Sequence, residues 1–228
     1  MVRVRVQRVL PDGNCLYRAL ATGLIFQYTG FNCGAGGVPN REKTLAGAFH
    51  NAAMLWIRQL VARRMNGEDV SHRTRWGKMS LVKLMRVAQR YLSRYGLHRG
   101  FATTRGARRS FMRRICPNPP RFVAGDGSNL LPCGVTANDL SLSVRRPRES
   151  FRSYLKKITR LYTWGGEPEC YVASLVLKLP LIVYQKRISP IRYSQAMSND
   201  HDIRILFSGE DQHYDTIITL PAHPILID

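Results

Sequence analysis

Three side chains have the types that thiol hydrolysis needs, and they stand near the two ends of the sequence. Cys15 follows a Pro-Asp-Gly-Asn turn, and His213 and Asp215 are two residues apart much later in the chain. A thiol protease needs a thiolate beside an imidazole base, amide donors for the oxyanion, and a third group that orients the imidazole. These residues therefore favour a thiol nucleophile with a histidine base.

Cys15 stands where the turn gives way to a helical pattern. Unpaired amides and the positive end of a helix favour a thiolate, so this position predicts a lowered pKa for Cys15. The same amides, in residues 12–15, are placed to hold the oxyanion of a tetrahedral intermediate. Gly13 lets the backbone approach closely because it has no Cβ. From the residues alone, a buried cysteine that only fills the core fits the same position.

His213 comes just after a short polar turn, residues 208–212, between two apolar segments. Along a strand, residues two apart point to the same side, so Asp215 is predicted to reach the ring nitrogen that does not face the sulfur. An exposed hairpin histidine is the alternative interpretation. His201, flanked by two aspartates, is a rival base in a predicted loop, and His50 is predicted to be a core or groove residue of a helix.

The elements that position these residues follow from hydrophobic periodicity. Residues 2–9 alternate Val2, Val4 and Val6 with polar side chains, which predicts a half-buried strand. Apolar residues at helical spacing predict helices, and runs of β-branched or large apolar residues predict strands. The predicted helices are 15–28, 44–60, 80–95, one that begins near Ser150 and one near Pro168; the later predicted strands are 181–185, 203–207 and 216–220.

Composition bounds the class of protein. The 228 residues, 44% of them apolar, suit a single domain, 1–228, with a buried core. Five cysteines without a C-x-x-C pair argue against a disulfide framework and a structural zinc site, and we expect no metal and no cofactor. The first residues form no apolar export signal, and no apolar run is long enough for a transmembrane segment. We therefore expect a reducing compartment, the cytoplasm, with the nucleus left open.

The charge is high and unevenly placed. The formal net charge is +20, and between residues 70 and 147 sixteen Lys or Arg stand against two Asp, a net of +14. Biased codon usage alone would not concentrate the charge in this way. We interpret residues 66–147 as a basic, arginine-rich insertion, and predict contact with nucleic acid or another anionic surface through residues 78–121.

Three segments resemble, in the same order, the motifs of the ovarian-tumour (OTU) family of cysteine proteases. The segment Asp12-Gly13-Asn14-Cys15-Leu16-Tyr17-Arg18 is similar to the nucleophile motif of that family. Trp164-Gly165-Gly166 is similar to its middle motif, and His213-Tyr214-Asp215 resembles its closing motif. The resemblance covers roughly residues 1–30 and 150–228.

The resemblance implies an α/β (α+β) fold of the papain-like, OTU type, a small mixed sheet flanked by helices, to which the basic insertion is added. It implies that Cys15 is the nucleophile, His213 the general base and Asp215 the residue that orients the base. The full set that it implies is Cys15, His213, Asp215 and Asp12 for catalysis, Gly13 and Asn14 for the oxyanion, and Trp164, Gly165, Gly166 and Tyr214 along the substrate channel. A plain core aromatic is the alternative interpretation of Trp164.

The same resemblance implies a deubiquitinase, a thiol isopeptidase that removes ubiquitin or a ubiquitin-like modifier from lysine side chains. Two alternatives stay open: the same chemistry on a viral polyprotein, and a nucleic-acid-binding protein that works through its basic insertion. The sequence departs from the family pattern at Gln212, where asparagine is frequent, and throughout residues 66–147. These departures bear on the choice of substrate and leave the three catalytic positions intact.

Overall fold

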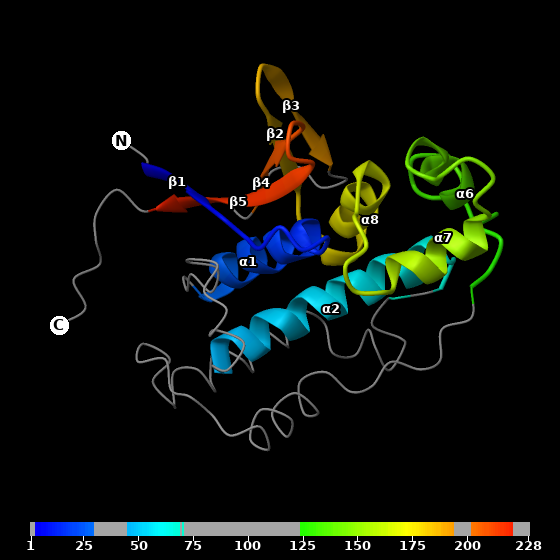
Figure 1. Cartoon of the computed structure of the whole chain (residues 1–228), viewed down its shortest axis with the longest axis horizontal. Coiled ribbons are helices and arrows are strands. Elements are labelled where there is room, and N and C mark those ends of the chain that lie inside the picture. Colours follow the sequence, from blue (N-terminus) through cyan, green and yellow to red (C-terminus); the bar gives the residue numbers. More distant parts are fainter. Residues whose placement is uncertain (1–2, 30–44, 69, 71–123, 194–201, 221–228) are drawn as a thin grey trace.

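The computed structural model describes residues 3–29, 45–68, 70, 124–193 and 202–220 of the chain (Figure 1). Its strands are β1 (Arg3–Gln7), β2 (Leu181–Gln185), β3 (Ile188–Tyr193), β4 (Ile203–Ser208) and β5 (His213–Leu220). Its helices are α1 (Cys15–Thr29), α2 (Leu45–Met65), α6 (Ala137–Leu140), α7 (Phe151–Ile158) and α8 (Glu167–Leu177), with a 3-10 turn, η3, at Ser141–Ser143. None of these helices is both long enough and apolar enough to cross a membrane.

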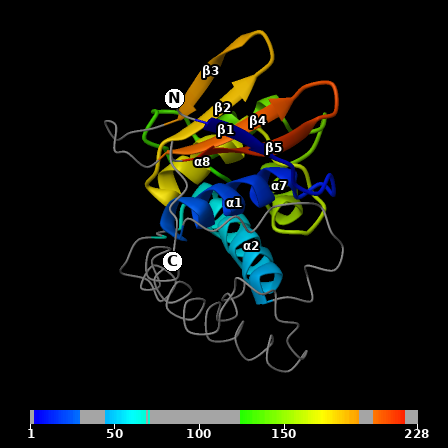
Figure 2. The same ribbon diagram turned by 90° about the vertical axis from the view of Figure 1, so that its left-hand side faces the viewer.

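The five strands form one mixed sheet in the order β1-β5-β4-β2-β3. β2 and β4 run parallel, and the other neighbouring strands run antiparallel. The sheet lies on one side of α1, and α2 lies on the other side (Figures 1 and 2). The predicted mixed sheet flanked by helices is therefore confirmed, and β5, the strand that carries the predicted histidine, lies directly against α1.

Helix α1 forms the centre of the core because it is covered on both sides. The side chains of its first three turns are buried almost throughout. Thr216 on β5 donates a hydrogen bond of 3.0 Å to the carbonyl of Ala19, which fixes the helix to the sheet. Burial of this many apolar side chains supplies most of the stability of such a layer. The residue that begins α1 is consequently held in a fixed place relative to β5.

Strand β1 is where the predicted burial is wrong in part. The strand forms, but its valine face is the exposed one: Val4 is 62% and Val6 45% exposed, while Gln7 is 3% exposed. The register explains the reversal, because Gln7 pairs with Thr216, the residue that bonds to α1. Gln7 therefore faces the helix layer, and the valines, which alternate with it, face away.

Periodicity located most elements but not all of them. The other strands and the helices predicted from 15, 44, 150 and 168 are present with small shifts of their ends. β3 was not predicted because it contains Pro190 and is largely exposed, which only an edge strand tolerates. The four-residue α6 also went unpredicted in a segment rich in Gly and Pro. The predicted helix 80–95 and the whole basic segment 78–121 lie outside the described residues.

Candidate active site

Cys15 begins α1 at the end of a tight turn and is 2% exposed. Gly13, two residues earlier, has a φ of +72°, which L side chains rarely adopt. A Cβ at Gly13 would lie 2.7 Å from the carbonyl oxygen of Tyr162, so the turn needs glycine for space as well as for conformation. The turn therefore places the thiol of Cys15 at the junction of the 12–15 segment, α1 and the loop at residue 162.

The environment of Cys15 differs from the sequence prediction in one respect. Burial raises the pKa of the Cys15 thiol above its ordinary value, and backbone hydrogen bonds from Tyr214 and Leu16 act in the opposite direction without overcoming it. The prediction of a lowered pKa is therefore wrong for the free protein, because removal from water outweighs the amides at the helix start. The bond from Tyr214 also places the sulfur next to the start of β5.

His213 is the first residue of β5, opposite Ser208 in the β4–β5 hairpin. Its Nε2 atom lies 3.1 Å from Oδ1 of Asp215, which confirms the predicted contact between residues two apart on a strand. The other ring nitrogen, Nδ1, is buried and has no hydrogen-bond partner in the described part of the chain. Nδ1 is thus the nitrogen left to accept a proton, while Asp215 fixes the ring through Nε2.

Asp215 is itself held by a residue that sequence analysis did not identify. The backbone amide of Val9 donates a hydrogen bond of 2.9 Å to Oδ1 of Asp215. Val9 follows β1, so the strand that begins the described chain orients the carboxylate that orients the histidine. No sequence signal marks this contact, because the donor is a main-chain group.

The carboxylate of Asp12 is engaged in the turn instead of facing a substrate. Arg18 donates to both of its oxygens, with the shortest contact 2.7 Å from Nη2 to Oδ2, and the backbone amide of Asn14 donates to Oδ1 at 3.1 Å. Burial acts to raise the pKa of Asp12, but the hydrogen bonds from Arg18 and Asn14 and the charge of Arg18 hold it below its ordinary value. Asp12 therefore holds the turn as an anion, and its predicted part in catalysis stays a prediction.

Asn14 also differs from its predicted role. Its main-chain amide is already bonded to Asp12, so this amide is not free for an oxyanion. Its side-chain Oδ1 instead accepts a hydrogen bond of 2.9 Å from the amide of Tyr162, and so links the turn to that loop. For the amides of Gly13 and Cys15 we find no main-chain or side-chain oxygen acceptor within the described residues, and these two donors remain for an oxyanion.

A cavity of about 660 Å³ opens beside this turn. It lies between the loop 162–166, the start of α8, the strands β2, β3 and β4, and Gln212. All four residues predicted along a substrate channel, Trp164, Gly165, Gly166 and Tyr214, line it. Trp164 is 52% exposed, so the alternative interpretation of a core aromatic is wrong.

The two glycines of the middle motif lie against α1 and at the start of α8. A Cβ at Gly165 would lie 2.6 Å from Cδ2 of Leu16 on α1. Gly166 caps α8, and its amide donates a hydrogen bond of 2.7 Å to Oε2 of Glu169. Glu169 is buried and also accepts a hydrogen bond from the hydroxyl of Tyr154, which fits the structural role predicted for it. The motif therefore fixes the start of α8 against α1.

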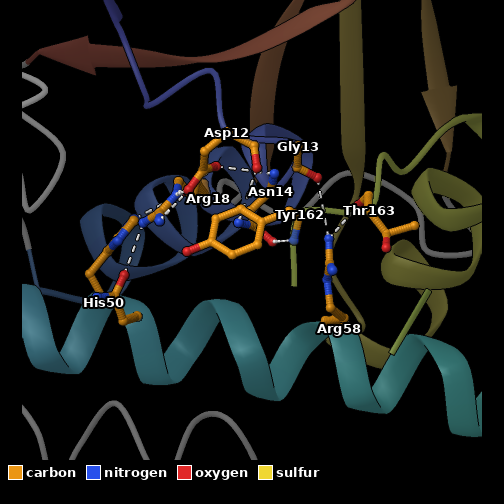
Figure 3. A network of polar contacts seen from close by, with 9 residues as sticks. Asp12, Gly13, Asn14, Arg18, His50, Arg58, Tyr162 and Thr163 are labelled. Atoms are coloured by element: carbon orange, nitrogen blue, oxygen red, sulfur yellow. Dashed lines mark hydrogen bonds and ion pairs between the residues drawn. The ribbon is translucent and has the colours of Figure 1, made fainter. Parts of the chain in front are cut away.

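Arg58 on α2 is the site residue that sequence analysis missed most completely (Figure 3). It is fully buried, and its Nη2 atom donates to the carbonyl of Thr163 at 2.5 Å and to the carbonyl of Gly13 at 3.4 Å. Its guanidinium lies over the ring of Tyr17, with 4.4 Å to the ring centroid. An arginine within a helical pattern is expected at the surface, so its residue type gave the opposite signal.

The other histidines give no rival site. His50 is buried, with Nε2 3.0 Å from the hydroxyl of Thr22, and burial together with the charge of Arg18 lowers its pKa to about 4. The predicted core position of His50 is confirmed. His201 lies outside the described residues. Within the described ranges, no group of three or more His, Cys, Asp or Glu side chains is arranged to hold a metal ion.

A curated relative matches part of this chain. No protein-family model matches this chain. An Arabidopsis thaliana protein named ovarian tumor domain-containing deubiquitinating enzyme 4 is 39% identical over 74 residues, which cover 30% of this chain and 23% of that protein. Over that segment this chain is similar to an OTU-domain protein. The matched segment spans less than a quarter of the length of the relative.

Two solved OTU structures show how far the likeness in shape extends. The Hazara virus OTU bound to ubiquitin is 15% identical, with 96% of this chain and 83% of that chain covered and a TM-score of 0.43. The viral OTU domain protease from Taggert virus is 14% identical, with 97% and 83% covered and a TM-score of 0.43. The likeness to the OTU family therefore consists of the partial curated match and the three motifs.

Proposed function

We propose that this protein is an OTU-type thiol isopeptidase that removes ubiquitin or a ubiquitin-like modifier from lysine side chains. One observation carries the proposal, the arrangement around His213. Its ring is bonded through Nε2 to Asp215, and Nδ1 has no hydrogen-bond partner among the described residues. The next residue, Tyr214, bonds through its backbone amide to the sulfur of Cys15. This arrangement joins a thiol, a base and an orienting carboxylate from the two ends of the chain. The name of the curated relative, a deubiquitinating enzyme, supports the choice of reaction.

The chemistry begins from a neutral thiol, because burial raises the pKa of Cys15. Nδ1 of His213 takes the thiol proton as the sulfur attacks the carbonyl carbon of the scissile bond. The amides of Gly13 and Cys15 stabilise the resulting oxyanion. His213 then gives its proton to the leaving lysine amine, and water attacks the thioester with the same histidine acting as base.

The cavity lined by the loop 162–166 and Tyr214 is the proposed path of the modifier's C-terminal tail. Cys15 and His213 do not line this cavity, and Tyr214, whose backbone amide bonds to the sulfur, connects it to them. Gly165 and Gly166 line the cavity, Gly165 against Leu16 of α1, and Tyr214 lines it from β5. A tail that ends in glycine suits this channel, because a residue without a side chain needs the least room at the scissile bond. Exposed apolar side chains also line the cavity and suit contact with a folded modifier: Val144, Tyr162 and Trp164.

Reaction with ubiquitin that carries a thiol-reactive group at its C-terminus tests the proposal. We expect one covalent adduct, located on Cys15 by mass spectrometry and absent from Cys15→Ala. An adduct on another cysteine, or none at all, contradicts a ubiquitin-directed Cys15. If Cys15 still reacts with a small alkylating agent, a polyprotein or another modifier becomes the substrate to examine.

The basic segment supports a second, separate proposal. Its net charge of +14 between residues 70 and 147 favours binding of nucleic acid through phosphate contacts. Neutral replacement of Arg108, Arg109, Arg113 and Arg114 should weaken retention of RNA or DNA and flatten its dependence on salt. Unchanged retention contradicts this second proposal and leaves the isopeptidase proposal untouched.

A further inference from the structure

The Gly13–Asn14 peptide is held from both of its ends. The carbonyl of Gly13 accepts a hydrogen bond from Arg58, and the amide of Asn14 donates to Asp12 on the other side (Figure 3). The C=O and N–H of a trans peptide point in opposite directions, so two opposed partners fix the plane of the peptide. The two amides that remain for an oxyanion, those of Gly13 and Cys15, flank this plane on either side.

Arg58 also joins this turn to the wall of the cavity. The same Nη2 atom that reaches Gly13 donates to the carbonyl of Thr163, next to Trp164. Each of the two segments contains a residue in the left-handed conformation, Gly13 with a φ of 72° and Tyr162 with a φ of 60°. Residues in that conformation persist where their surroundings hold them. Arg58, on α2, stabilises both segments through its hydrogen bonds to the carbonyls of Gly13 and Thr163.

A buried guanidinium is an unusual choice for a purely structural contact. Its Nε and Nη1 atoms have no hydrogen-bond partner among the described residues, although leaving buried donors unpaired is costly. Its nearest acidic neighbour in the core, Glu169, already accepts hydrogen bonds from Tyr154 and Gly166. An apolar side chain would fill the same space without leaving donors unpaired, so the two carbonyls are what the arginine provides.

We propose that Arg58 is a positioning residue for the oxyanion-binding turn, whose guanidinium fixes the Gly13–Asn14 peptide and ties it to the loop at Thr163. The inference rests on the proposed thiol chemistry at Cys15, and it does not depend on which protein substrate is cut. Arg58 itself touches neither the sulfur nor the substrate in this account, and acts only through the two main-chain carbonyls.

Two reactions of Cys15 separate this role from simple stabilisation. Hydrolysis of p-nitrophenyl acetate passes through a tetrahedral oxyanion, whereas alkylation by iodoacetamide does not. Both rates depend on the fraction of thiolate, so their ratio removes that dependence at each pH. The peptide that contains Cys15 is followed by mass spectrometry for alkylation, and a Cys15→Ala blank is subtracted from the ester rate.

The expected result is a change in this ratio that depends on a donor at the position of Nη2 of Arg58. Arg58→Met should lower the ester rate relative to the alkylation rate about 10-fold or more, with the roughly 100- to 1,000-fold loss of a removed oxyanion donor as the upper bound. Arg58→Lys keeps the charge, but its side chain is one bond shorter than the path to Nη2, so its nitrogen does not reach the two carbonyls in the same way and the ratio should fall about 5-fold or more. If the methionine variant does not fold, the lysine variant alone carries the test.

Arg63→Met is the matched control, since Arg63 is a buried arginine of the same helix that pairs with Glu68. It should lower the melting temperature and leave the ratio within about 2-fold. The proposal is overturned if the Arg58 variants also keep the ratio within 2-fold, or if the wild-type protein is alkylated at Cys15 but does not hydrolyse the ester. A wild-type protein that hydrolyses the ester but ignores ubiquitin refutes the proposed function and leaves the role of Arg58 standing.

Discussion

Replacement of Asp215 tests the proposed triad most directly. Its Oδ1 atom accepts from Val9 and lies 3.1 Å from the ring of His213, and the side chains of this pair are only 14% and 16% exposed. Asp215→Asn keeps an oxygen in this place but removes the charge that stabilises a protonated ring. Asp215→Ala removes the oxygen as well, so the ring is free to turn.

The size of the effect follows from the strength of the lost contact. A hydrogen bond to a charged group contributes about 1.5–3 kcal/mol. Since about 1.4 kcal/mol corresponds to a tenfold change in rate, we expect kcat to fall roughly 10- to 150-fold in Asp215→Asn and further in Asp215→Ala. The alanine variant also leaves the amide of Val9 without its acceptor, which should lower stability by about 1 kcal/mol or more.

Hydrolysis of a ubiquitin–fluorophore conjugate measures kcat and KM, and thermal unfolding measures stability. Asp211→Asn is the matched control, because Asp211 is an exposed acid in the same hairpin that bonds to Ser208. It should leave kcat unchanged. If Asp215→Ala retains kcat within about twofold while unfolding at a lower temperature, Asp215 serves only the attachment of β1, and the triad argument is refuted.

Three further predictions follow from the site. Because burial raises the pKa of the Cys15 thiol, alkylation of Cys15 by iodoacetamide should still be rising above pH 8; a plateau reached below pH 7 would contradict a neutral resting thiol. Gln212 has a φ of 50°, which asparagine adopts more readily. Gln212→Asn should therefore raise the free energy of unfolding by up to ~1 kcal/mol in denaturant, with kcat unchanged. A lower free energy of unfolding would mean that the hydrogen bond from Gln212 to the carbonyl of Gly209 outweighs the relief of backbone strain. Val144→Ser combined with Trp164→Ser should raise KM for the ubiquitin conjugate about tenfold without slowing alkylation of Cys15, and an unchanged KM would exclude this rim as a docking surface.

The parts of the site that can be predicted from sequence are those whose geometry is set by residues close together in the chain. A turn of Pro-Asp-Gly-Asn before a cysteine, and a histidine two residues before an aspartate on a strand, each specify their own local geometry. Both were found where they were expected, and the contact between His213 and Asp215 is present. The strands and helices that carry these residues were predicted for a similar reason, because their hydrophobic periodicity is also a local pattern.

The parts that sequence did not predict depend on contacts between distant segments. Arg58 lies in a helical pattern whose polar positions are normally outside, and only the arrival of two loop carbonyls makes its buried position tolerable. The outward-facing valines of β1 have the same origin, because the register with β5 decides which face meets α1. The raised pKa of Cys15 likewise depends on how deeply the rest of the fold buries the thiol, which cannot be predicted from the neighbouring residues in the sequence.

The bond between Val9 and Asp215 has a consequence for the time at which the protein becomes active. It spans 206 positions of the sequence, so the orienting carboxylate is secured only after nearly all of the described chain exists. A ribosome that adds 5–20 residues per second needs roughly 10–40 s to travel that distance. During that interval Cys15 is already synthesised but has no base beside it. The proposed triad therefore forms only when the described part of the chain is nearly complete.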